Sequence, residues 1–247
     1  MQALLDTIAQ LARPTDAQRV FHGRGGQYPG CEHWTLDAYP PVWLLTCFGD
    51  VDEPAIATLQ AALATRWQAI APGEPLNLVL QLRQPAHSDT RLLCGTVPEP
   101  HEATEAGARY RVHLLRGQNH GLFLDMAEGR RWLREQAGGA KVLNLFAYTC
   151  AFSIAALQGG ARSVLNVDMA SGALATGQQN HALNGLAGRA RFLPHDIFKS
   201  WGKLTRGGPY DIVVVDPPSY QKGSFVASKD YARLLRRLPD LLAPEGQ

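Results

Sequence analysis

An acid, two prolines and an aromatic ring stand together near the C-terminal end of the chain. This segment, Asp-Pro-Pro-Ser-Tyr at 216–220, directly follows the apolar run 211–215, whose β-branched residues predict a buried parallel strand. The prolines end such a strand, because proline cannot continue the ladder and holds the preceding residue extended. The turn therefore lies at the carboxyl end of a strand, where open α/β sheets bind ligands. We expect a slot for a flat substrate, with Tyr220 stacking on it and Asp216 orienting it or taking up its proton.

A second candidate ligand-binding turn follows the strand predicted at 141–145. The chain passes through residues 146–150 (Phe-Ala-Tyr-Thr-Cys) into a predicted helix that stops at Gly159-Gly160, a typical C-terminal signal. Small residues in such a turn allow backbone N–H groups and the helix start to approach a carboxylate or phosphate. No glycine occurs between Gly139 and Gly159, which argues against a dinucleotide, whose pyrophosphate needs glycine-rich close approach.

Acids also follow the next two predicted strands. Asp168 ends the strand predicted at 163–167, about 20 residues after the first turn, where a carboxylate can accept both ribose hydroxyls of a nucleoside. Asp196 follows the short strand predicted at 190–193 and can accept from an adenine amino group, while Ile197 packs on the ring. Polar residues at four consecutive strand ends thus suit successive parts of one nucleoside-containing cofactor.

Residues 110–247 resemble the class I S-adenosylmethionine-dependent methyltransferases that modify bases of large-subunit ribosomal RNA, the group that makes 5-methylcytosine or 7-methylguanine in bacterial 23S RNA. Three segments carry the resemblance: Asn-His-Gly-Leu-Phe-Leu-Asp at 119–125, Asn-Leu-Phe-Ala-Tyr-Thr-Cys at 144–150, and the segment 216–220. The resemblance implies S-adenosylmethionine as cofactor, covered from its N-terminal side by the first segment. It implies these cofactor-binding residues: Phe123, Asp125, Asn144, Phe146, Ala147, Thr149, Asp168, Asp196 and Ile197.

The expected fold is α/β, a Rossmann-like methyltransferase sheet in residues 117–247 preceded by a smaller α+β domain in residues 1–116. Only four or so of the seven strands usual for the class are predicted, so the sheet looks incomplete at its C-terminal side. In the first domain, apolar spacing predicts helices near 4–11 and at 53–71, and strands at 42–48, 76–82 and 110–114. The polar stretch 98–107 predicts an exposed loop. This domain could hold a substrate beside the active site.

Composition excludes several classes of protein. No run of 18 apolar residues and no basic-then-apolar N-terminus occurs, so neither a membrane span nor secretion is indicated. The four cysteines lie far apart without paired metal spacing, which favours reduced thiols in a cytoplasmic protein. Cys31, Glu32 and His33 with His22 could be interpreted as a metal cluster, but the cysteine spacing does not favour one, so no metal is expected.

Charge is distributed unevenly along the chain. Residues 1–116 contain 9 Lys or Arg and 12 Asp or Glu, whereas residues 117–247 contain 15 Lys or Arg and 10 Asp or Glu. The basic excess therefore lies in the part with the proposed active site, as an RNA substrate would favour. An excess of five charges spread over a domain surface is also unremarkable by itself.

The reaction these features favour is in-line methyl transfer to a nucleobase, in which the protein mainly aligns donor and acceptor. Asp216, Pro217, Pro218 and Tyr220 are the candidate catalytic residues, the prolines shaping the slot. None of the four cysteines stands where the relatives that methylate cytosine C5 place their attacking cysteine, so carbon methylation is not supported. Two alternatives remain open: a methyltransferase acting on a small molecule or protein side chain, and a non-catalytic nucleotide- or RNA-binding module.

Overall fold

The computed structural model describes residues 1–50, 52–84, 88–221 and 225–247. The chain forms two compact units, Met1–Asp125 and Met126–Gln247. Residues 117–125 thus group with the first unit, whereas the sequence suggested a boundary at 116/117. Two hydrogen bonds hold them there, because Gln81 Nε2 donates to the Gly117 carbonyl and Tyr39 Oη donates to the Leu122 carbonyl, each at 2.9 Å. No helix within the described ranges is long and apolar enough to cross a membrane.

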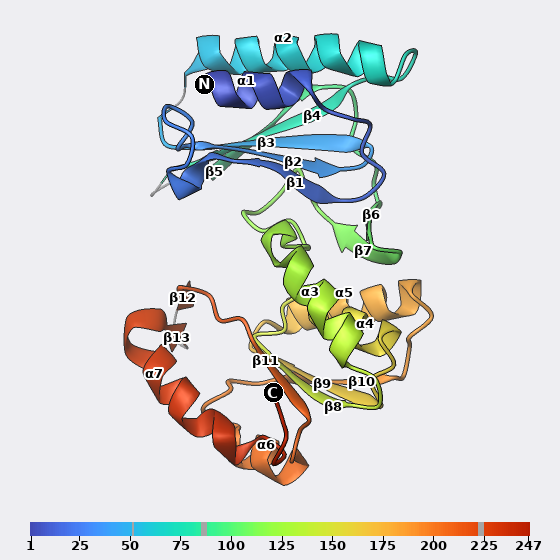
Figure 1. The fold of residues 1–247 in the computed structure, drawn as a ribbon, viewed down its shortest axis with the longest axis vertical. Coiled ribbons are helices and arrows are strands. Elements are labelled where there is room, and N and C mark those ends of the chain that lie inside the picture. The colour runs from blue at the N-terminus through green and yellow to red at the C-terminus, as the bar shows by residue number, and fades with distance from the viewer. Residues whose placement is uncertain (51, 85–87, 222–224) are drawn as a thin grey trace. The chain divides into compact units, whose positions relative to one another are not determined.

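The first unit has an α+β fold built on a five-stranded sheet in the order β1-β2-β3-β4-β5. Neighbouring strands are antiparallel except β3 and β4, which are parallel because α2 (Glu53–Ile70) connects them as a crossover. Helix α1 (Gln2–Ala9) lies beside α2 on one face of this sheet (Figure 1). The strands are β1 (Gln18–His22), β2 (Trp34–Tyr39), β3 (Val42–Phe48), β4 (Asn77–Arg83) and β5 (Ser88–Cys94).

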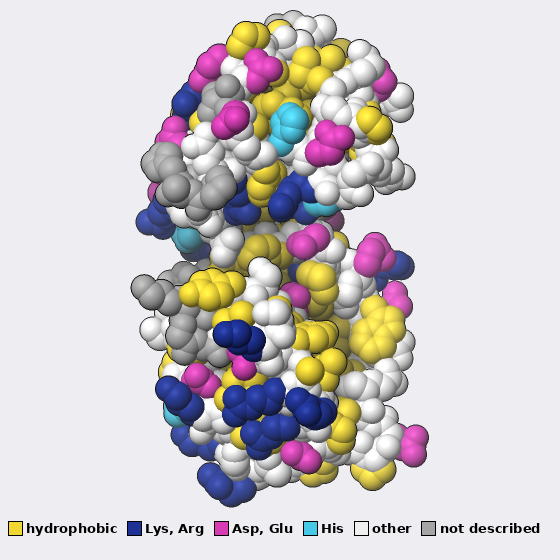
Figure 2. Space-filling view, turned by 90° about the vertical axis from the view of Figure 1, so that its left-hand side faces the viewer, with side chains coloured by type: hydrophobic (Ala, Val, Ile, Leu, Met, Phe, Trp, Pro, Cys, Tyr) yellow, Lys and Arg dark blue, Asp and Glu magenta, His cyan; other side chains and the backbone are white. Residues whose placement is uncertain are grey.

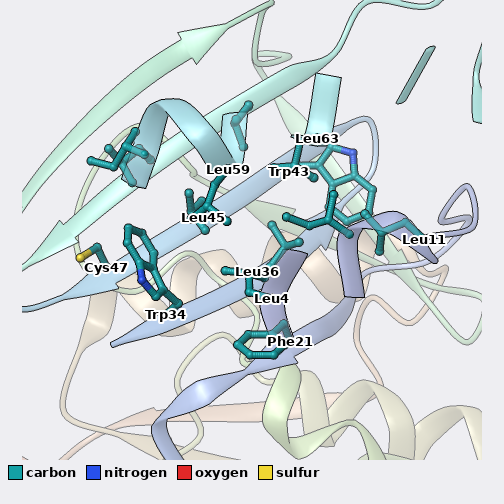
Figure 3. Packing of buried hydrophobic residues seen from close by; sticks show 14 of the residues in the cluster. Leu4, Leu11, Phe21, Trp34, Leu36, Trp43, Leu45, Cys47, Leu59 and Leu63 are labelled. Atoms are coloured by element: carbon teal, nitrogen blue, oxygen red, sulfur yellow. The ribbon is translucent and has the colours of Figure 1, made fainter. Parts of the chain in front are cut away.

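Apolar side chains from α1, α2 and the helix-covered face of the sheet form the core of this unit (Figure 3). Leu4 of α1 and Leu59 and Leu63 of α2 are at most 1% exposed and pack with Leu36 and Leu45 of the sheet. The helical spacing seen in the sequence therefore predicted the buried faces of both helices correctly.

Two expectations for the first unit were wrong. The alternating leucines near 76–82 predicted a half-buried strand, but β4 lies between β3 and β5 and is buried on both faces. Its polar Gln81 is only 1% exposed, because its side chain bonds to the carbonyl of Gly117. The stretch 98–107 contains a strand, β6 (His101–Glu105), paired antiparallel with β7 (Ala108–Val112). His101 is 3% exposed and its Nε2 lies 3.1 Å from the Pro40 carbonyl, so a contact with a residue 61 positions earlier buries the start of this polar segment.

The second unit is a parallel four-stranded sheet in the order β10-β9-β8-β11, which confirms the predicted Rossmann-like α/β class. Its strands are β8 (Lys141–Leu145), β9 (Ser163–Asp168), β10 (Ala190–Pro194) and β11 (Ile212–Val215). At the free edge of β11, Gln247 donates to the Asp211 carbonyl and accepts from Val213 N.

Helices cover both faces of this sheet (Figure 1). Helices α3 (Ala127–Gln136), α4 (Ala151–Gln158) and α5 (Ser171–Leu183) lie on one face, and α6 (Trp201–Gly207) and α7 (Ala227–Arg237) on the other. Successive residues of β8 follow the strand period of two, because Leu143 and Leu145 join the core with α6 and α7 while Asn144 bonds on the α4 side. A short hairpin of β12 (Tyr220–Gln221) and β13 (Phe225–Val226) precedes α7.

Candidate active site

The candidate site lies at the carboxyl edge of the second unit's sheet. Strand β8 is central, with β9 and β10 on one side and β11 on the other, so the chain reverses its order of strands beside β8. Ligands of open α/β sheets bind at such a switch point. The loops that follow β8, β9, β10 and β11 all start from this edge, as the sequence predicted.

The turn after β8 is sharply wound without glycine. Phe146, Tyr148 and Cys150 have φ angles of 55°, 48° and 64°, a left-handed conformation that is uncommon for side chains other than glycine and costs free energy. Backbone bonds hold it, since Ala147 N–H donates to the Val167 carbonyl at 3.1 Å and Cys150 N–H to the Ala147 carbonyl at 2.7 Å. The alternating conformation turns the chain from β8 directly into α4.

The Asp168 carboxylate connects the turn after β8 with the loop after β9. Its Oδ2 accepts from Tyr148 N–H and its Oδ1 from Ala170 N–H, both at 2.8 Å, and the residue is 8% exposed. A carboxylate has about four acceptor positions, so two remain for hydroxyl donors. The sequence placed Asp168 correctly at the end of β9 but did not reveal this second, structural role.

Asn144 belongs to a buried polar chain on the α4 side of the sheet. Its Nδ2 donates to Asn166 Oδ1 at 2.9 Å, and Asn166 Nδ2 donates to Ser153 Oγ at 3.0 Å. Asn144 is 2% exposed. The side chain therefore links β8 with β9 and α4, and a direct contact with a cofactor stays a prediction.

Ser153 and His181 end this chain and resemble a nucleophile–base pair. Ser153 Oγ lies 2.9 Å from His181 Nε2, and His181 Nδ1 donates to the Gly177 carbonyl at 2.6 Å. Both residues are at most 1% exposed, and burial lowers the pKa of His181, so the imidazole is neutral. Because no substrate can reach the hydroxyl, the pair serves packing rather than catalysis.

Helix α5 packs tightly against the turn. Cys150 is fully buried, and burial, aided by Asp168, raises the pKa of its thiol. A Cβ on Gly177 would lie 2.5 Å from Cys150 Sγ, and Asn180 Nδ2 donates to the Thr149 carbonyl at 3.1 Å. Cys150 therefore has a packing role, and α5 fixes the backbone of the turn from behind.

The loop after β10 is shaped by its acid. Asp196 Oδ1 accepts from Lys199 N–H at 3.0 Å, and within the described part of the chain its other carboxylate oxygen has no partner. Ile197 is 4% exposed and packs with Trp201 and Leu204 in the core between sheet and α6. Asp196 thus keeps an acceptor for a ligand, whereas Ile197 offers little surface, and stacking on adenine stays a prediction.

The segment after β11 forms the most exposed part of the site. Asp216 and Pro218 are exposed, and Tyr220 is 65% exposed. The Ser219 carbonyl accepts from Ala227 N–H at 3.0 Å, and Tyr220 pairs with Val226 in the β12–β13 hairpin. The loop is therefore anchored to the start of α7, while the Tyr220 ring remains open to an incoming group.

Phe225 connects this hairpin to the rest of the site, a role that sequence analysis missed. It is 1% exposed, its ring lies 5.0 Å from that of Phe146 at 69°, and it stacks with Phe198 at 6.4 Å and 6°. Loops after β8, β10 and β11 thus meet through three aromatic rings. The only local signal was the apolar pair 225–226 after a run of polar residues, which does not reveal the partners of Phe225.

Phe123 and Asp125 belong to the first unit. Phe123 is 42% exposed and lines a pocket with Arg19 and Asp37. Burial alone would lower the pKa of Arg19, but its hydrogen bond to Asp37, with a smaller contribution from Asp125, raises it. Contact of Phe123 or Asp125 with a cofactor held by the second unit stays a prediction.

Comparisons with known proteins agree with this geometry. A family model described as S-adenosylmethionine-dependent methyltransferase matches residues 18–247. The chain belongs to the S-adenosylmethionine-dependent methyltransferase family. The crystal structure of SMU.776 complexed with SAH has a TM-score of 0.81 at 27% identity, and the match covers 99% of this chain and 66% of that one. The family's cofactor is S-adenosylmethionine.

Curated relatives within the family are ribosomal RNA methyltransferases. Ribosomal RNA large subunit methyltransferase K/L of Psychrobacter sp. is 38% identical over 59% of this chain and 19% of its own length. Ribosomal RNA large subunit methyltransferase I of Aeromonas salmonicida is 29% identical over 86% of this chain and 55% of its own length. The chain therefore spans between a fifth and just over half of these relatives.

The chemistry at the sheet edge fits the family's cofactor. Asp168 retains acceptor positions for two hydroxyls and Asp196 retains an acceptor for an amino group. Ala147 and Thr149 in the turn after β8 are 6% and 4% exposed, and their contact with the methionine part of the cofactor stays a prediction. Among the described residues, no group of three or more His, Cys, Asp or Glu is placed to hold a metal ion.

Proposed function

We propose that the protein transfers a methyl group from S-adenosylmethionine to a base of ribosomal RNA. The observation that supports it best is the Asp168 carboxylate, which joins the first two loops of the sheet edge and keeps acceptors for a ribose. The exposed acid and aromatic ring after β11 start from the same edge, on the other side of β8. The naming of the curated relatives supports RNA as the acceptor. Such a reaction would take place in the cytoplasm.

Each proposed residue has one role in this reaction. Phe146, Ala147 and Thr149 line the methionine part of the cofactor, Asp168 binds its ribose, and Asp196 with Ile197 binds its adenine. When bound, S-adenosylmethionine supplies a methyl group on a sulfonium, from which transfer is strongly favoured.

The segment 216–220 handles the acceptor. Tyr220 stacks on the flat base, Asp216 orients it or accepts its proton, and Pro217 and Pro218 keep the slot rigid. A base within an RNA helix must be unpaired or flipped out to reach this slot. In this proposal the second unit binds the cofactor, Phe123 and Asp125 are further candidate cofactor-binding residues, and the first unit helps to hold the RNA.

Transfer of radiolabelled methyl groups to ribosomal RNA tests the proposal. RNA from cells lacking the gene should accept label, whereas RNA from cells that carry it should already be methylated. Equal background labelling of both RNAs would reject ribosomal RNA and leave a small-molecule or protein acceptor. Absence of S-adenosylhomocysteine binding heat in calorimetry would reject methyl transfer altogether.

A further inference from the structure

Basic side chains gather on the surface formed by α6, α7 and the residues just before α6. Figure 2, which views the second unit from the side of α7, shows Lys and Arg concentrated there with few acids. We name this the α6/α7 basic surface. Its members are Lys199, Lys203, Arg206, Lys229, Arg233, Arg236 and Arg237.

These cations lack acidic partners. Six of the seven are exposed, and none forms an ion pair within the described residues. The one acid in α7, Asp230, accepts from Val226 N–H at 2.9 Å and so stabilises the start of the helix. An uncompensated cluster of this kind attracts a polyanion and would be self-repulsive without one.

Two of the arginines are held in fixed orientations. The Arg233 guanidinium lies 4.4 Å from the centre of the Phe198 ring, and the Arg237 guanidinium lies 4.3 Å from that of Trp201. A guanidinium stacked by one face keeps its edge N–H groups for bidentate bonds to a phosphate. Stacking therefore gives these side chains a pre-organisation that ordinary solvated arginines lack.

The basic surface begins at the candidate acceptor slot. Ala227 N–H at the start of α7 donates to the Ser219 carbonyl at 3.0 Å, so the helix leaves directly from the segment 216–220. An 11-residue helix is about 16 Å long, enough to follow a few nucleotides.

The centre of the apolar side of α7 is used within the protein. Leu234 is fully buried, and Leu238, which follows the helix, packs with it in the core beside Trp201 and Leu204, so that only Tyr231 and Leu235 of this side stay exposed, at 42% and 44%. A basic helix that binds a membrane surface needs its apolar face free to enter the lipid. The arrangement therefore favours a nucleic acid backbone over a membrane.

We propose that the α6/α7 basic surface binds the sugar-phosphate backbone of the RNA strand next to the base in the acceptor slot, an inference that rests on the proposed function. Phosphate contacts position a strand without reading its sequence. The surface would therefore determine how tightly the RNA binds and its direction across the slot, while the slot itself selects the base.

Two double variants that each remove two positive charges test this. Arg233→Gln/Arg236→Gln should weaken binding of a 23S RNA fragment on the order of tenfold at low salt, and should reduce the slope of log K against log salt by about 0.7 per charge. The control is Arg131→Gln/Arg189→Gln, which also removes two positive charges, at exposed positions outside this surface. Arg131 lies on α3, where it forms an ion pair with Glu128. It should bind RNA like the wild type. Affinity for S-adenosylhomocysteine should be unchanged in both.

Three results would overturn the inference in distinguishable ways. If the wild type binds S-adenosylhomocysteine but no RNA, RNA is rejected as the acceptor. The proposed role of the α6/α7 basic surface is then rejected as well. If the wild type binds RNA but both double variants match it, or lose affinity equally, the surface alone is wrong. If Arg233→Gln/Arg236→Gln loses binding to anionic phosphatidylserine vesicles while RNA binding persists, the partner is a membrane.

Discussion

Replacing Asp168 with alanine should impair both the cofactor and the fold, because the same carboxylate serves both. The variant loses two hydrogen bonds from Tyr148 N–H and Ala170 N–H, each 2.8 Å long in the structure. A hydrogen bond to a charged acceptor contributes about 1.5–3 kcal/mol to stability, and we take the lower value because water can reach this edge of the sheet. Loss of the two bonds should therefore lower the free energy of unfolding by about 3 kcal/mol. For a protein of this size that lowers Tm by roughly 6–12 °C.

The loss of the ribose acceptor adds a separate effect on binding. Removing a charged acceptor costs about 1.5–3 kcal/mol, so S-adenosylhomocysteine should bind about 10- to 100-fold more weakly. Isothermal titration measures the affinity, and scanning calorimetry measures Tm on the same samples. Asp168→Asn, which keeps one acceptor oxygen, should lie between alanine and wild type in both measurements.

Asp211→Ala provides a matched control. Asp211 also accepts a backbone N–H, that of Lys141 at 2.7 Å, but at the amino end of β8. Its loss should lower Tm without changing the affinity for S-adenosylhomocysteine. A folded Asp168→Ala variant with affinity within twofold of wild type would refute the ribose assignment. Weaker affinity with an unchanged Tm would instead refute the structural role of the carboxylate.

Three further predictions concern the acceptor segment and the buried core. Asp216→Asn and Tyr220→Ala should each cripple methyl transfer while leaving affinity for S-adenosylhomocysteine within a few-fold, because the adenosine contacts are proposed on earlier loops. Phe225→Ala should lower the free energy of unfolding by about 3–5 kcal/mol, as for other buried phenylalanines, and Phe225→Leu by much less. Stability should fall as the pH drops below the ordinary histidine pKa, and His181→Gln should reduce that pH dependence, because the folded state keeps this residue neutral while the unfolded chain binds a proton.

Each of these has an outcome that contradicts it. Loss of cofactor binding in both acceptor-segment variants, without a separate effect on turnover, would place that segment in the cofactor half of the site. An unchanged urea midpoint for Phe225→Ala would mean that the aromatic cluster is not a unit. Identical pH profiles of unfolding for wild type and His181→Gln would remove the histidine from the pH dependence.

The sequence by itself determined the parts of the second unit that depend on neighbours along the chain. Short β-branched runs predicted the strands, the pair Gly159-Gly160 predicted the end of α4, and the prolines after Asp216 predicted the end of β11. Because the strands are parallel, their carboxyl ends meet at one edge, so the positions of Asp168 and Asp196 followed from local signals alone.

Only the tertiary structure decided the features that depend on distant partners. Within the polar segment 101–105, His101 is buried against the carbonyl of Pro40, 61 residues earlier, which composition cannot reveal. Phe225 gained its role from rings 27 and 79 residues away, and Asp168 gained its second role from the N–H of Tyr148, 20 residues before it. Local sequence determines which strands form and what chemistry their ends bring, whereas burial and hydrogen-bond partners arise from non-local contacts that exist only after the chain has folded.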